Sequence, residues 1–212
     1  MNRSEISKPV QWVVWGVLFT VILAIFVLFA RQRLTTVKSK LPVYSVLRDF
    51  ALTNQDNKVI SLSDLAGKVW IADIIFTRCP GPCRRMTKDM ARLQDLWPKD
   101  ASVHFISLTS DPEYDTPAVL KRFAQEYKAD LDRWDFLTGT KQQIVNVAVD
   151  ELKLTRIEKP EGERESVDDL FIHSTIFVVI DKRGQLRATI ETDQPDSLTH
   201  AREVVDELLH DR

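Results

Sequence analysis

The feature that most constrains the fold is an apolar run that leads into the only two cysteines of the chain and then into a helical pattern. Val69 to Phe76 is apolar except for Asp73, as expected of a strand covered on both faces of a sheet. Cys79 and Cys83 follow in a turn made of proline and glycine, and apolar residues then recur at helical spacing. This order predicts an α/β fold with both sulfurs at a strand-to-helix turn.

The rest of the domain alternates strand and helix patterns. The predicted strands are Val103–Leu108, Trp134–Leu137, Ser174–Asp181 and Leu186–Glu191, and the predicted helices begin at Pro117 and span Lys141–Leu152 and Ser197–Leu209. We therefore expect a thioredoxin-like fold, with a mixed central sheet flanked by helices. We interpret Asp73 as a hydrogen-bonded polar group near the end of its strand.

Residues 10–30 form a long apolar run. At about 1.5 Å per residue, a helix of this length crosses a hydrocarbon core of roughly 30 Å. The small residues of a signal-peptide cleavage site do not follow it, so we expect one uncleaved N-terminal transmembrane helix. Residues 1–9 then form a cytoplasmic tail, polar residues 31–42 a tether, and residues 43–212 the folded domain.

The charges around this run do not by themselves set its orientation. Arg3 and Lys8 precede it and four basic residues follow it, a count that would place the domain in the cytoplasm. A large domain, however, translocates largely regardless of charge. The first nine residues do not resemble a transit peptide. We expect a single-pass protein of a bacterial inner membrane, with its domain facing the periplasm or exterior.

Composition excludes several classes of function. The 212 residues allow one ordinary domain plus appendages, and the net charge of −2 offers no basic field for nucleic acid, so no nucleic-acid partner is expected. Two cysteines are too few for a disulfide scaffold. The sequence has no phosphate-binding glycine loop and no HExxH zinc motif. The cysteine pair is therefore the main candidate for chemistry.

The position of the pair at a helix start favours anionic sulfur. Pro82 suits the first helical position, which places Cys83 in the first turn. A helix N-terminus and the nearby arginines should lower thiol pKa values. Thiolates serve both soft metal ions and disulfide exchange, and the motif leaves both uses open. Exchange without metal would make the chain a thiol-disulfide oxidoreductase.

His173 precedes the strand expected to face the cysteines, where redox thioredoxins commonly carry a proline. Two thiolates and one imidazole form a soft ligand set that suits three-coordinate Cu(I) and accepts Cu(II) with a further ligand. Structural zinc normally needs four such ligands, and no fourth is evident. An ordinary histidine at the start of a strand is the alternative for His173.

Four separated segments carry a resemblance to a known family. They read F-T-R-C-P-G-P-C at 76–83, D-P-E-Y-D-T-P at 111–117, L-T-G-T at 137–140 and H-S at 173–174. In order and spacing they resemble the Sco/SenC family, copper-binding thioredoxin-like factors for assembly of the CuA centre of cytochrome c oxidase. The resemblance covers roughly residue 43 to the C-terminus.

The resemblance implies a copper metallochaperone more than an enzyme. By position, Cys79, Cys83 and His173 would hold Cu(I) or Cu(II). The implied partners are an oxidase subunit carrying CuA, or another copper protein, and a thiol reductant for the pair. The chain departs from the family at Gly81, where members often carry an acidic residue, and at Arg84, where they often carry proline. We expect these departures to affect the choice of partner more than metal binding.

Overall fold

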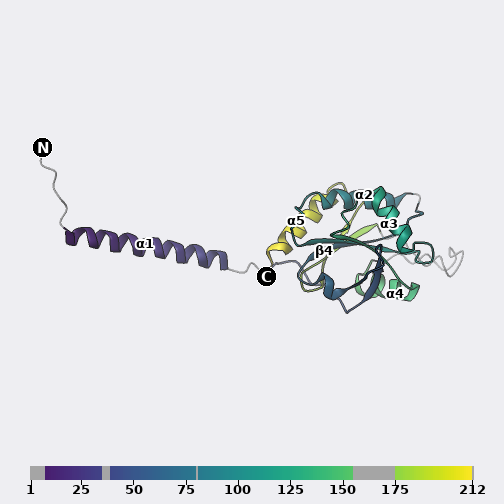
Figure 1. Cartoon of the computed structure of the whole chain (residues 1–212), viewed down its shortest axis with the longest axis horizontal. Helices are drawn as coiled ribbons and strands as arrows, with labels where there is room; N and C mark the ends of the chain where they lie inside the picture. The colour runs from purple at the N-terminus through teal and green to yellow at the C-terminus, as the bar shows by residue number, and fades with distance from the viewer. Residues whose placement is uncertain (1–7, 35–38, 80, 155–174, 212) are drawn as a thin grey trace. The chain divides into compact units, whose positions relative to one another are not determined.

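The computed structural model describes residues 8–34, 39–79, 81–154 and 175–211, with side chains of the first helix described at positions 12 and 14–26. The chain divides into two units. One comprises residues 1–38 and the last two residues, and the other comprises residues 39–210 (Figure 1).

The first unit contains one helix, α1 (Lys8–Leu34). Its described apolar side chains are largely exposed, with Trp12 at 79% and Phe19 and Phe26 at 68%. Among the segments that the structure describes, no helix combines the length and apolarity required to cross a membrane. The predicted anchor at 10–30 therefore remains a prediction.

One mixed sheet organises the second unit, and in the described part of the chain it has eight strands (Figure 1). Their order is β1-β8-β7-β4-β5-β6-β2-β3. Central β4 pairs parallel with β5 and antiparallel with β7, which confirms the predicted mixed sheet. The strands are β1 (Ser45–Val46), β2 (Ala51–Asn54), β3 (Val59–Ser61), β4 (Val69–Ile75), β5 (Val103–Thr109), β6 (Trp134–Thr138), β7 (Ile176–Ile180) and β8 (Gln185–Glu191).

Helices cover both faces of this sheet. Figure 1 shows α2 (Pro82–Gln94), α3 (Pro117–Glu126) and α5 (Ser197–His210) on one side and α4 (Lys141–Val145) on the other. The 3-10 turn η1 (Leu62–Leu65) packs on the α4 side, since Leu65 belongs to that core. This two-sided cover explains why β4 is apolar along almost its whole length.

The side chains of β4 alternate between two cores. Ile71 and Ile75 pack with α2, α3 and α5, whereas Trp70 and Ile74 pack with the α4 side. By the same alternation, Asp73 faces the α2 side. Both cysteines belong to the α2-side core, so the sheet positions the thiol pair against this core.

The helix predicted at Lys141–Leu152 differs from the observed one. It consists of short α4, opened by a Thr140 capping box, and a π-helix, η2 (Asn146–Glu151). The N–H of Leu152 accordingly donates to the carbonyl of Val147, five residues back. The apolar spacing fits an α-helix and a π-helix about equally well, so the pattern could not predict this widening.

Candidate thiol site

The two cysteines occupy the turn between β4 and α2. The N–H of Cys79 donates to the carbonyl of Phe76 at 3.1 Å, which closes the turn after the strand. Helix α2 begins at Pro82 after Gly81 as N-cap, so Cys83 lies in the first helical turn as predicted. The N–H of Cys83 points at the sulfur of Cys79, with 3.4 Å between N and Sγ. The local fold thus brings both sulfurs together.

Both thiols are free and buried, at 1% and 4% residue exposure for Cys79 and Cys83. Burial is the main cause that raises the pKa of the Cys83 thiol, and the adjacent Cys79 thiol and the charge of Asp73 raise it further. The expected lowering at a helix start is therefore wrong for Cys83. The helix start is present, but desolvation outweighs it, and Arg84 and Arg85 are exposed to solvent.

A buried carboxylate fixes the turn that precedes Cys79. Asp115 is fully buried and accepts hydrogen bonds from the N–H of Thr77 at 3.0 Å, the Thr77 hydroxyl at 2.5 Å and the Thr109 hydroxyl at 2.6 Å. It thereby joins the cysteine turn to the end of β5 and the start of α3. Helix α3 begins at Pro117 as predicted, with Thr116 as its N-cap. The bracing role of Asp115 had no sequence signal beyond its proximity to Pro117.

Arg78, directly before Cys79, contacts Asp111 and Tyr114 rather than the cysteines. Its Nη2 lies 2.5 Å from Oδ2 of Asp111, and its guanidinium lies 4.0 Å from the ring centroid of Tyr114. The hydrogen bond with Asp111 raises the pKa of Arg78. The carboxylate of Asp111 is therefore held by Arg78 across the turn.

Asp73 is a second buried acid on the α2 side of the sheet. Neither carboxylate oxygen has a hydrogen-bond partner among the described residues. Burial raises the pKa of Asp73 to about 7. Ser107 lies opposite it in β5. The Ser107 oxygen accepts from the indole N–H of Trp134 at 3.1 Å. The expectation of a hydrogen-bonded group near the strand end is therefore wrong: Asp73 is an interior, fully buried carboxyl.

The third predicted ligand, His173, lies outside the described residues. Within the ranges that the structure does describe, no group of three or more His, Cys, Asp or Glu side chains could hold a metal ion. The structure therefore brings Cys79 and Cys83 together and leaves the position of His173 a prediction. His104 is a buried residue of β5, with its Nε2 2.9 Å from Oδ2 of Asp135.

The comparison with known families decides the identity of the domain. The SCO1/SenC family model matches residues 39–209, which include the cysteine turn, the Asp115 segment and the whole sheet. The chain belongs to the SCO1/SenC family. The thioredoxin-like fold predicted from the strand-cysteine-helix order is thereby confirmed.

Individual relatives agree with this assignment. The SCO1 protein homolog of Bacillus subtilis (strain 168) is 40% identical over 147 residues, covering 68% of this chain and 73% of the relative. BsSco, a member of the Sco family of cytochrome c oxidase assembly proteins with a disulfide switch, superposes with a TM-score of 0.66 at 33% identity, covering 81% of this chain and 97% of its own. ScoI of Bradyrhizobium japonicum, solved with copper bound, gives 0.62 at 21% identity, covering 77% and 99%, which shows a shared fold.

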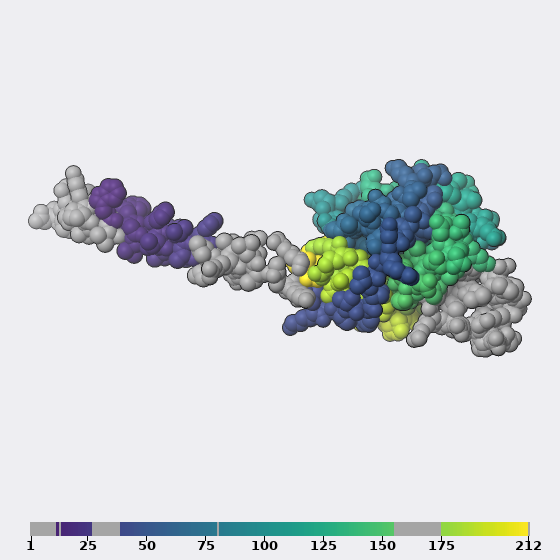
Figure 2. All heavy atoms as spheres, turned by 90° about the horizontal axis from the view of Figure 1, so that it is seen from below, coloured from purple at the N-terminus to yellow at the C-terminus, as the bar shows by residue number. Residues whose placement is uncertain are grey.

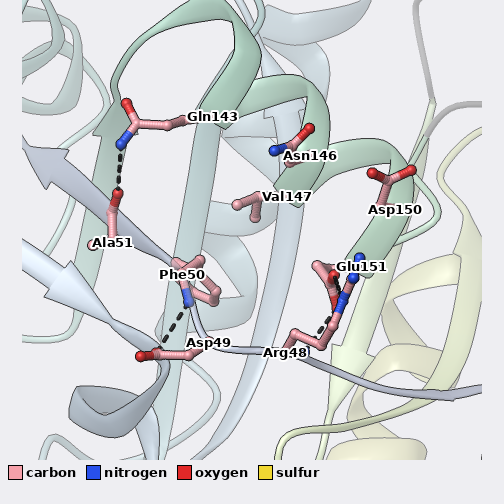
Figure 3. Close-up of a pocket in the computed structure, with 9 residues that line it drawn as sticks. All are labelled: Arg48, Asp49, Phe50, Ala51, Gln143, Asn146, Val147, Asp150 and Glu151. Atoms are coloured by element: carbon pink, nitrogen blue, oxygen red, sulfur yellow. Dashed lines mark hydrogen bonds and ion pairs between the residues drawn. The ribbon is translucent and has the colours of Figure 1, made fainter.

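A polar pocket of about 490 Å³ lies on the opposite face of this Sco/SenC domain (Figure 3). The segment Arg48–Ala51 forms one wall and residues of α4 and η2 form the other. Figure 2 shows this face in space-filling form, with green α4 and blue N-terminal residues of the domain. Glu151 binds both the N–H and Nε of Arg48, at 2.8 and 2.7 Å. These polar groups satisfy one another and lie across the sheet from the thiols.

Proposed function

We propose that this chain is a membrane-anchored copper metallochaperone. It holds Cu(I) or Cu(II) through Cys79, Cys83 and His173 and delivers the ion during cytochrome c oxidase assembly, with the CuA site of an oxidase subunit as recipient. The observation that carries the proposal is the pair of free thiols held together at the β4–α2 turn of a Sco/SenC domain. The copper-bound ScoI of B. japonicum shares this fold, and BsSco belongs to a family of oxidase assembly proteins.

The geometry suits a soft, transferable ion. Two thiolates provide the ligand type that copper prefers, and the turn that carries them is braced by the buried Asp115. The sulfurs are shielded from water, which favours Cu(I) over a hydrated ion. Because metal binds thiolate, uptake must also displace the proton from Cys83. The histidine would complete the set as the one nitrogen ligand.

Copper stoichiometry of the reduced protein tests the two sulfurs. We expect one copper per wild-type chain and none held tightly by Cys79→Ser or Cys83→Ser, since removal of either thiolate leaves an incomplete soft site. Thr87→Ser, a conservative change one turn further along α2, serves as the control and should bind like wild type. Tight binding of one copper by the Cys79→Ser, Cys83→Ser double variant would contradict the proposal.

A thiol-disulfide oxidoreductase is the second candidate, and one observation favours it. The N–H of Cys83 points at Cys79 Sγ, so a backbone donor is available to a thiolate that attacks a partner disulfide. In this function the chain keeps partner cysteines reduced and needs no metal. The reduced protein should then reduce a test disulfide, with His173→Ala as fast as wild type. Failure to reduce it removes this candidate.

We also propose that residues 10–30 anchor the protein in a bacterial inner membrane. Residues 1–9 would stay in the cytoplasm, and residues 31–42 would tether the domain on the periplasmic or exterior side. The exposed apolar side chains of α1 support this placement, because a long row of such groups needs an apolar environment. A C-terminal alkaline phosphatase fusion should be active in cells. An inactive, stably expressed fusion would contradict the orientation.

A further inference from the structure

A basic groove lies beside the cysteine pair, along the exposed side of α2. It has a volume of about 410 Å³ and is formed by α2 together with the end of α3. Its lining residues, here called the α2–α3 groove, are Arg84, Lys88, Ala91, Arg92, Glu126, Tyr127 and Lys128. Four cations and one carboxylate thus face this hollow, although the whole chain carries a net charge of −2. The groove is therefore positively charged on a protein whose net charge is slightly negative.

One end of the groove lies at the start of α2, close to the cysteine turn. Arg84 directly follows Cys83 in the first turn of α2. Tyr127 is half-buried against the core that contains both cysteines, with its ring 4.8 Å from that of Phe123. Burial raises the pKa of Tyr127, and the charge of Cys79 contributes to that rise, which agrees with their proximity. A ligand in the groove would therefore lie beside the first turn of α2, which carries Cys83.

Two of the four cations in the groove, Lys88 and Lys128, are available to a ligand, whereas Arg92 Nη1 pairs with Asp89 Oδ1 at 2.9 Å. Arg84 Nη1 pairs with Glu126 Oε1 at 3.1 Å, but both side chains are about half exposed, so water screens this pair. In the described part of the chain, neither Lys88 nor Lys128 forms an ion pair. The N-terminus of α2 adds partial positive charge at the same end. The surface around the thiols therefore attracts anions.

We propose that the α2–α3 groove receives an acidic segment of the protein partner that meets the cysteine pair. The inference deepens the proposed function by naming the charge of the partner, and it holds whether the meeting transfers copper or electrons. It gives Arg84, one of the departures from the family pattern, a role in partner choice. Steering by such a field raises association rates, and salt weakens it.

An anionic membrane is a different ligand for basic residues, and the shape of the surface favours a protein. A bilayer presents a broad plane, whereas this surface is hollowed between two helices and carries a carboxylate, Glu126, inside the hollow. A protruding acidic loop can enter such a groove and pair with Lys88 and Lys128 separately. The membrane remains an outcome that the test below detects.

Disulfide probes of different charge test the groove without an identified partner. The reduced protein is mixed with the dianion 5,5′-dithiobis(2-nitrobenzoate) or with neutral 2,2′-dithiodipyridine. One cysteine thiolate attacks a probe sulfur, the probe S–S bond breaks, and an aryl thiolate leaves with the electron pair. The second cysteine loses its proton to solvent and displaces the second aryl thiolate, which closes a Cys79–Cys83 disulfide. The pair is oxidised by two electrons, and the probe becomes two thiols.

The measured quantity is the rate with the anionic probe divided by the rate with the neutral probe. We expect Arg84→Gln with Lys88→Gln to lower this ratio by on the order of 5-fold at low salt, and the difference to vanish at 1 M salt. Lys58→Gln with Lys68→Gln removes the same charge elsewhere and should match wild type. Both control residues are far from the cysteine turn. Lys68 precedes the start of β4, roughly 23 Å from the end of the strand that leads into the cysteines. Lys58 precedes β3, which lies four strands from β4 in the sheet, about 19 Å away.

Several outcomes would overturn the inference. They are an equal rate ratio in the groove variant and wild type, an equal loss in the control variant, or binding of the protein to phosphatidylglycerol vesicles that the groove variant abolishes. Wild-type copper stoichiometry, measured in parallel, keeps the two proposals separate. Absence of copper with a lowered rate ratio removes the metallochaperone and keeps the groove, and the reverse result removes the groove alone.

Discussion

Desolvation decides the protonation of two acids on the α2 side of the sheet. The Cys83 thiol and the Asp73 carboxyl are both buried, and burial is the largest cause of the raised pKa of each. The positive end of α2 and the exposed Arg78, Arg84 and Arg85 do not overcome this effect. Water screens the charges of the arginines at the surface, whereas it does not solvate the two buried acids. For these two groups, solvent exposure therefore predicts the direction of the pKa shift better than the nearby charges do.

Asp73 should make stability depend on pH. Its pKa is raised from 3.8 to about 7, so the folded state binds the proton more tightly than the unfolded state. The contribution of Asp73 to stability is therefore fully present below about pH 4 and is lost as pH rises through about 7. The loss amounts to about 4 kcal/mol in the free energy of unfolding of the reduced, metal-free protein.

Asp73→Asn tests this prediction, since the amide does not ionise. Urea unfolding between pH 4 and pH 8.5 should show a much flatter profile for the variant than for wild type. Asp193→Asn, on an exposed turn, is the control and should keep the wild-type slope. Parallel profiles for wild type and Asp73→Asn would show that Asp73 does not titrate in this range.

At the scale of elements, the turn between β4 and α2 depends on one buried carboxylate. Asp115→Asn should lower the free energy of unfolding by about 2–4 kcal/mol, because an amide cannot accept from all three donors that the carboxylate satisfies. Thr77→Val removes only the hydroxyl bond to Asp115 and should cost about 1 kcal/mol. Urea unfolding of the reduced protein measures both. Equal losses for the two variants would contradict this role.

Gly81, in the cysteine turn, and Gly139, beside Leu52 of the α4-side core, provide a matched pair. A Cβ at Gly139, in the L-T-G-T turn, would lie 2.8 Å from Cδ2 of the buried Leu52, whereas one at Gly81 would meet nothing within 4 Å. Gly139→Ala should therefore destabilise the domain by about 1–3 kcal/mol through overpacking, and Gly81→Ala should change stability by less than about 0.5 kcal/mol. Thermal unfolding compares the two. A larger loss for Gly81→Ala would show that the turn needs glycine for another reason.

The sequence predicted the elements that depend on periodicity and on turn chemistry. The run at 69–76 and the Pro82 start give β4 and α2 almost to the residue, because burial on two faces and a proline-started helix leave clear patterns. The widening at η2 has no such pattern. The roles of Asp73, Asp111 and Asp115 depend on distant residues that the fold brings together, and local spacing predicted for Asp73 only a hydrogen-bonded group near the end of its strand.

At the scale of the whole molecule, the sheet separates two surfaces with different properties. The thiol pair and the α2–α3 groove lie on one side, and the polar pocket at Arg48 and Glu151 lies on the other. The net charge of −2 conceals this asymmetry. The overall composition could not predict a basic groove beside the cysteine turn, because that groove arises from one face of α2 and the end of α3.

The proposed copper site requires His173 to join Cys79 and Cys83 as a ligand. The most direct measurement is the copper affinity of the reduced protein, by competition with a chelator of known affinity, for wild type, His173→Ala and His200→Ala, an exposed control on α5. We expect His173→Ala to weaken copper binding by about 10-fold or more, in line with the loss of one ligand, and His200→Ala to match wild type. Equal affinity of His173→Ala and wild type would contradict it.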